Sequence, residues 1–245
     1  MFRFIFVILV VTIFLICSIP LLLILEIVGV FNKESKENIS SAVISWAFGM
    51  IASMSGVKLT VVGEENIAQN ENVLYVGNHR SIFDIILLYH LIKKPAVIIS
   101  KKEMNRIPVF NIWERNIGCL FLDRKDIKQG LQIILQAIEI VKTKASVIIF
   151  PEGTRSKTEG EFLPFKAGSF KISEKSKCSV IPVTFINTGC IFEDHKPFIK
   201  KTHVVVCFGE PIVTKDYTRD DFKELHTLAY NKVVEMYNIN KGLAD

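Results

Sequence analysis

The chain has 245 residues, enough for one large domain or two small ones. Hydrophobic residues make up 49% of it and charged residues 22%, a balance that excludes an intrinsically disordered chain. With only 13 glycines and 8 prolines, it is neither collagen-like nor of low complexity. The net charge of +5 is modest, and it suits an anionic lipid surface or a phosphorylated substrate as well as an ordinary solvated surface.

Residues 4–25 carry no charged side chain, and we predict that they form one apolar helix. Such a helix reaches about 33 Å, roughly one hydrocarbon thickness, so we interpret it as a membrane anchor. A cleaved signal peptide is the alternative, because Arg3 precedes the run. The run is longer than a signal core, however, and no A-x-A-like cleavage site follows it.

A second apolar stretch, 42–57, follows a polar link over residues 32–41. It is short for a span, so it is either an interfacial or re-entrant helix beside the first, or an ordinary buried helix of the following domain. The composition changes near residues 55–60. We therefore predict a hydrophobic two-helix anchor over 1–56 and a single domain over 57–245.

From residue 57 onward, short runs rich in Val, Ile and Phe alternate with longer helical patterns. The predicted strands cover residues 58–62, 73–76, 96–99, 119–122, 147–150, 180–185 and 204–208. The predicted helices cover residues 82–92, 108–116, 126–142, 166–175 and 220–237. This alternation predicts an α/β fold with a largely parallel or mixed sheet flanked by helices.

The cysteines and histidines indicate no metal site. The five cysteines are odd in number and include no C-x-x-C pair, so we expect reduced thiols without a disulfide or zinc. The histidines other than His79 show no ligand spacing.

A first candidate site, residues 77–84, lies between a predicted strand and a predicted helix, where α/β folds bind ligands. With His79 in the turn and Asp84 in the first helical turn, the carboxylate can fix the imidazole tautomer. His79 is then a candidate general base. The alternative is structural, because Ser81 and Asp84 also match a helix capping box.

Three further strand ends carry cations. Residues 150–156 combine a glycine, hydroxyl groups and Arg155 in a plausible phosphate cradle, or form only a polar turn. Arg124 follows another strand, as a phosphate ligand or as a partner of Asp123. Lys101 and Lys102 follow a third predicted strand. Considered by themselves, two adjacent lysines are typical of a solvated surface. If these ends share one edge of the sheet with His79, a base faces several cations.

These motifs occur together and in order, and through them the chain resembles the 1-acyl-glycerol-3-phosphate acyltransferase family over residues 57–212. The N-H-x-S-x-x-D motif is matched by Asn78, His79, Ser81 and Asp84. The K-K-E-[LM] and G-x-x-x-x-D-R motifs are matched by Lys101, Lys102, Glu103, Met104, Gly118, Asp123 and Arg124. The F-P-E-G-T-R-S motif is matched by residues 150–156, and F-K-x-G, V-I-P-V and G-E-P-I by residues 165–168, 180–183 and 209–212.

The resemblance implies a glycerolipid acyltransferase fold and a direct acyl transfer. His79, oriented by Asp84, would deprotonate the sn-2 hydroxyl of 1-acyl-glycerol 3-phosphate, and that oxygen would attack the thioester of acyl-carrier protein or acyl-CoA to give phosphatidic acid. Backbone N–H groups near Asn78 or Gly153 would stabilise the oxyanion. The implied substrate-binding residues are Lys101, Lys102, Arg124, Glu152, Gly153, Thr154 and Arg155.

The resemblance also implies partners and a location. We expect lysophosphatidic acid, an acyl thioester and the lipid bilayer as partners, no cofactor, no metal and no nucleic acid. The expected location is the inner membrane, with the catalytic domain on its cytoplasmic face. Two alternatives stay open: acyl transfer to another lysolipid or to glycerol 3-phosphate, and a non-catalytic module that binds anionic lipid.

Overall fold

A seven-stranded mixed sheet forms the centre of the molecule in this computed structural model, which describes residues 2–123 and 125–244. The strands are β1 (Val57–Val62), β2 (Leu74–Gly77), β3 (Ala96–Lys101), β4 (Leu120–Leu122), β5 (Ser146–Ile149), β6 (Val180–Ile186) and β7 (Thr202–Phe208). Their order is β1-β7-β6-β2-β5-β3-β4. Each strand overlaps a predicted run, and every pair is parallel except β6 with β7. The predicted α/β class is therefore confirmed.

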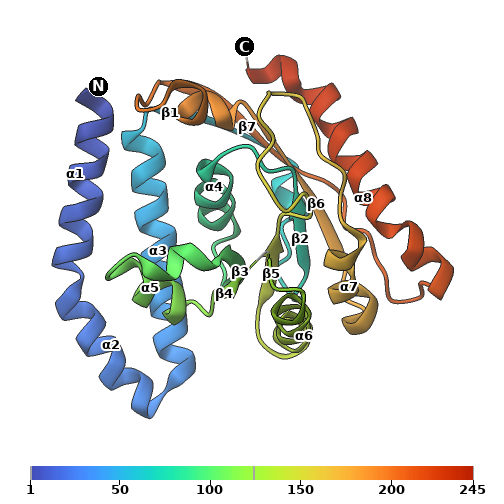
Figure 1. Cartoon of the computed structure of the whole chain (residues 1–245), viewed down its shortest axis with the longest axis horizontal. Coiled ribbons are helices and arrows are strands. Elements are labelled where there is room, and N and C mark those ends of the chain that lie inside the picture. The colour runs from blue at the N-terminus through green and yellow to red at the C-terminus, as the bar shows by residue number, and fades with distance from the viewer. Residues whose placement is uncertain (1, 124, 245) are drawn as a thin grey trace.

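Helices cover both faces of this sheet (Figure 1). They are α1 (Phe2–Cys17), α2 (Ile19–Phe31), α3 (Lys33–Met54), α4 (Ile82–Ile92), α5 (Phe110–Asn116), α6 (Ile127–Thr143), α7 (Lys171–Ser176) and α8 (Arg219–Asn240). Alternate residues of β2 show why two layers are needed. Tyr75 packs with α3 and α4, whereas Leu74 and Val76 pack with α6, α7 and α8. A central strand that is apolar at every position buries both of its faces.

The N-terminal apolar run does not form the single helix that we predicted. The helix breaks at Ser18, and α1 and α2 meet there with a bend of 44°. Pro20 lies in the first turn of α2. It lacks an N–H group, and its ring displaces the carbonyl four residues earlier, so it bends an otherwise apolar helix. The Trp113 indole N–H donates to the Ser18 hydroxyl at 3.0 Å, which ties the bend to α5.

Within the described chain, no single helix meets the length and hydropathy that a membrane crossing requires, and α1 and α2 meet them only as a bent pair. Large apolar side chains nevertheless stay exposed along both helices. They include Ile5, Leu9, Ile13, Ile16, Leu23, Ile24 and Ile27.

The second apolar stretch belongs to α3, which begins at Lys33 and so includes the segment we predicted to be a polar link. Asn32 caps this helix by accepting from the Ser35 N–H at 2.9 Å. Ile44 and Phe48 are buried, and the Phe48 ring meets Tyr89 of α4 edge to face. The face of α3 toward the sheet is therefore an ordinary buried surface, while α2 packs beside it (Figure 1). The division at residue 57 stays a prediction.

Candidate active site

The loop after β2 and the first turn of α4 hold His79 and Asp84 together. Asp84 is fully buried, and its Oδ2 accepts from His79 Nδ1 at 2.8 Å. The same oxygen accepts from the N–H groups of Arg80 at 2.7 Å and Ser81 at 2.8 Å. The Ser81 hydroxyl in turn accepts from the Phe83 N–H, which completes the capping box. The two alternatives for Asp84 are thus compatible, because one carboxylate caps the helix and holds the imidazole.

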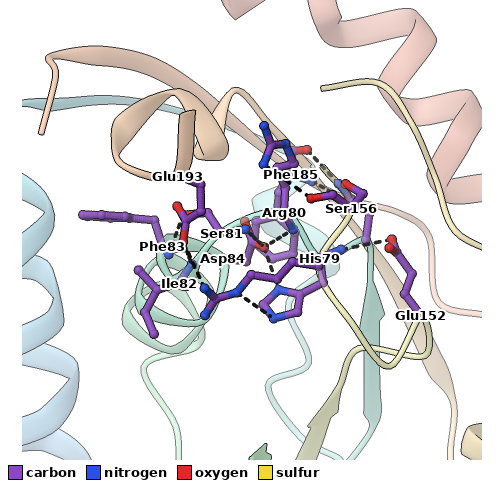
Figure 2. Close-up of polar contacts among 12 residues, drawn as sticks. His79, Arg80, Ser81, Ile82, Phe83, Asp84, Glu152, Ser156, Phe185 and Glu193 are labelled. Atoms are coloured by element: carbon purple, nitrogen blue, oxygen red, sulfur yellow. Dashed lines mark hydrogen bonds and ion pairs between the residues drawn. The ribbon is translucent and has the colours of Figure 1, made fainter. Parts of the chain in front are cut away.

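His79 is fixed from several sides (Figure 2). Its ring stacks on Phe150 with the centroids 4.2 Å apart. The backbone N–H of His79 donates to Glu152 Oε1 at 3.1 Å, and its backbone carbonyl accepts from the Ser156 N–H at 2.8 Å. These contacts join the loop after β2 to the loop after the neighbouring strand β5. The imidazole Nε2 then faces Arg155, whose Nε lies 3.5 Å away.

Glu152 supports the backbone of this loop. The side chain is buried, and burial raises the pKa of its carboxyl to about 8, with a smaller contribution from the negative charge of Asp84. The N–H of His79 donates to the carboxyl, which offsets part of that rise. At neutral pH the carboxyl is therefore largely protonated. The uncharged form suits a position close to the buried Asp84 carboxylate.

Gly153 and Asn78 have structural contacts of their own. Gly153 adopts φ +72°, and its N–H donates to the Phe150 carbonyl at 3.0 Å. A Cβ at this position would lie 2.6 Å from Lys166 Nζ, so the glycine allows that ammonium to approach. The Asn78 side-chain amide exchanges two hydrogen bonds with the backbone of Phe185. Oxyanion donors were expected near Asn78 or Gly153, and the N–H of Gly153 itself is already engaged in its turn.

Two further predicted cations, Lys101 and Lys102, lie further along the same edge. Strands β2, β5, β3 and β4 are parallel neighbours, so their carboxyl ends share one edge, and the condition set in the sequence analysis is met. Both lysines are exposed there. Lys101 forms an ion pair with Glu103 at 3.4 Å, and Lys102 forms one with Asp123 at 3.1 Å. Thr154 is exposed. Arg124 lies outside the described residues.

Three charged residues of the site escaped the sequence reasoning. Glu193 binds Arg155 and the start of α4, and Asp194 forms an ion pair with the buried Arg80. Both acids belong to a short helical turn, Glu193–His195, after β6. No local motif marks them, because their partners are 38 and 114 residues away. Among residues 2–123 and 125–244, no group of three or more His, Cys, Asp or Glu side chains is placed to hold a metal ion.

Known proteins are similar to this chain in sequence. The family model described as Acyltransferase matches residues 58–186. A Helicobacter pylori protein named 1-acyl-sn-glycerol-3-phosphate acyltransferase is 35% identical over 69% of this chain and 70% of its own length. A protein of the same name from Borreliella burgdorferi is 36% identical over 57% of this chain. The match spans 55% of that relative and 60% of a Saccharomyces cerevisiae relative with the same name.

One solved structure shares the whole architecture. It is the crystal structure of the 1-acyl-sn-glycerophosphate (LPA) acyltransferase PlsC from Thermotoga maritima. The superposition has a TM-score of 0.84 and covers 98% of this chain and 95% of that one, at 24% sequence identity. The similarity therefore extends over the N-terminal helices as well as the sheet.

Proposed function

Since this chain belongs to the acyltransferase family, as its motifs predicted, we propose that it transfers a fatty acyl group to the sn-2 hydroxyl of 1-acyl-glycerol 3-phosphate. The donor is the thioester of acyl-carrier protein or of CoA, and the product is phosphatidic acid. The names of the relatives support the acceptor. The observation that carries the chemistry is the buried 2.8 Å contact between His79 Nδ1 and Asp84 Oδ2.

This contact makes His79 a base of fixed orientation. With its proton held at Nδ1 by Asp84, the imidazole presents an unprotonated Nε2 at the other end of the ring. Nε2 takes the proton of the acceptor hydroxyl as the oxygen attacks the thioester carbonyl. The tetrahedral intermediate then expels the thiolate, which takes the proton back from His79 Nε2. One base serves both proton transfers, so the transfer requires no acyl-enzyme.

The acceptor phosphate would bind beside this base. Arg155 lies against His79 Nε2 and keeps about a third of its side chain exposed. A guanidinium fork binds phosphate through parallel N–H groups. Lys166 beside Gly153 adds a second positive charge next to the same loop. We assign Lys101 and Lys102, at the end of β3, to the outer part of the phosphate site. For Arg124 we keep the phosphate-binding role that the resemblance implies.

The assay compares wild type with His79→Ala in liposomes supplied with 1-acyl-glycerol 3-phosphate, glycerol 3-phosphate or a lysophospholipid. The donor is the acyl thioester of acyl-carrier protein or of CoA, labelled in its acyl group. We expect turnover on the first acceptor and a loss of at least ~10²-fold in the variant. His226→Ala is the control, because His226 lies on α8, which packs on the opposite face of the sheet from α4. A preference for another acceptor would mean that this acceptor is the substrate and that the proposed one is wrong. Lipid binding without turnover on any acceptor would favour a non-catalytic module.

We further propose that α1 and α2 dock the enzyme on the cytoplasmic face of the inner membrane. The observation is the exposed apolar surface of these helices, which includes Ile24 and Ile27. Ile24→Glu with Ile27→Glu should weaken binding to anionic vesicles while activity on detergent-dispersed acceptor persists. Ile239→Glu, an exposed position near the C-terminus, is the matched control. Unchanged vesicle binding in the double variant would contradict the docking.

A further inference from the structure

One carboxylate, that of Glu193, joins the two loops of the site. Its Oε1 accepts from the Ile82 N–H at 3.0 Å and pairs with Arg155 Nη1 at 3.1 Å. Its Oε2 accepts from the Ser81 hydroxyl. Figure 2 shows Glu193 above the first turn of α4, beside Ser81 and Ile82. The carboxylate therefore connects the helix that holds Asp84 with the cation that faces His79.

The contact fixes how Arg155 presents its guanidinium. The Glu193 side chain is only 7% exposed, whereas that of Arg155 is 38% exposed. Nη1 is bound to the buried carboxylate, and Nε points at His79 Nε2. A guanidinium is planar and its N–H bonds lie in that plane, so holding Nη1 at the buried carboxylate restricts the directions in which its other N–H groups can point. Arg155 thereby presents a preset edge to a ligand that enters from solvent.

The segment that carries Glu193 is held on both sides. The Phe192 ring stacks on Phe4 of α1, with the centroids 5.6 Å apart and the planes 8° from parallel. Asp194 forms its ion pair with the buried Arg80. These two anchors leave the intervening carboxylate little freedom. A charged group supported in this way is preorganised, and preorganisation reduces the entropy lost when a ligand is bound.

We propose that Glu193 is a positioning residue that aims Arg155 at the phosphate of the acceptor. The proposal rests on the proposed function and extends it to a residue outside the recognised motifs. Glu193 acts through Arg155 and does not touch the reacting atoms. Its negative charge is the property under test. Oε1 serves both Ile82 and Arg155, so a neutral amide can keep these contacts as ordinary hydrogen bonds but no longer forms the ion pair with Arg155.

Glu193→Gln separates these two roles, and Arg155→Ala supplies the second corner of a double-mutant cycle. Two quantities are measured in detergent for wild type, each single variant and the double variant. The first is kcat and KM for 1-acyl-glycerol 3-phosphate. The second is the Kd of its 2-deoxy analogue, which lacks the attacking hydroxyl and reports binding without turnover. Glu139→Gln, which removes a carboxylate from an exposed ion pair, controls for net charge.

We expect Glu193→Gln to raise the acceptor KM and the analogue Kd roughly tenfold, with kcat within about threefold of wild type. When Arg155 is already alanine, Glu193→Gln should cause no further rise in the acceptor KM or the analogue Kd. A KM and a Kd of Glu193→Gln that both lie within twofold of wild type would overturn the proposal. Fully additive changes of KM and Kd in the double variant would overturn it as well. If the wild type binds the analogue with this mutational pattern but shows no turnover, the positioning role stands and the proposed reaction falls. If the wild type does not bind the analogue, both fall.

Discussion

Glu152 makes the stability of this protein depend on pH in a direction that the structure sets. Its carboxyl is 3% exposed, and its pKa rises from an ordinary 4.5 to about 8 because burial disfavours the charged form. Between these two pH values the folded state holds a proton that the unfolded chain has released. The stabilisation is complete below pH 4.5 and is lost as the pH rises toward 8. Glu152→Gln keeps an acceptor for the His79 N–H but cannot titrate.

The size of the effect follows from the same shift. One proton changes the free energy of unfolding by at most about 1.4 kcal/mol per pH unit, or about 4 kcal/mol from pH 5 to pH 8. Relaxation of the loop around a buried charge reduces this value. We therefore expect wild type to lose roughly 2 kcal/mol relative to Glu152→Gln over this range.

Urea unfolding, followed by tryptophan fluorescence in detergent at pH 5, 6, 7 and 8, measures this difference. Both variants contain the same tryptophans, so their transitions can be compared directly. Glu139→Gln should follow the wild-type profile, because Glu139 is exposed and lies outside the site. Parallel profiles for wild type and Glu152→Gln, within about 0.5 kcal/mol, would refute the argument that this carboxyl is protonated in the folded protein.

Two further predictions test the contacts around the site. Asp84→Asn should lower kcat at least ~10²-fold, because the amide lacks the negative charge that stabilises the imidazolium formed when His79 takes a proton. Its oxygen can still accept from the N–H groups that cap α4, so the far-UV circular dichroism should stay unchanged. A wild-type kcat would leave Asp84 with only its capping role. Gly189→Ala should lower the free energy of unfolding by about 1–3 kcal/mol, because the new Cβ would lie 2.7 Å from Cζ of the buried Arg80. An unchanged urea midpoint in that variant would show that Arg80 moves aside freely.

The sequence was sufficient to locate the strands of the sheet and most of the helices that follow them, although α7 begins at Lys171 and not at the predicted residue 166. Apolar runs bounded by turn residues predicted all seven strands, and the helix over residues 82–92 has the predicted limits. These signals are local, because burial on both faces of a sheet requires an apolar residue at every position. The proximity of His79 and Asp84 was also predictable, since it needs only a turn followed by a helix cap.

The tertiary structure decided what local pattern cannot express. Pro20 starts the bend at Ser18, and the hydrogen bond from Trp113 of α5 then ties that bend to the rest of the fold. The strand order decides that the loop after β5 lies beside the loop after β2, and so brings Arg155 to His79. Glu193 reaches Arg155 only because β6 and the turn after it fold back over the start of α4. A contact between segments far apart in the chain has no period or spacing in the sequence, so only the folded chain reveals it.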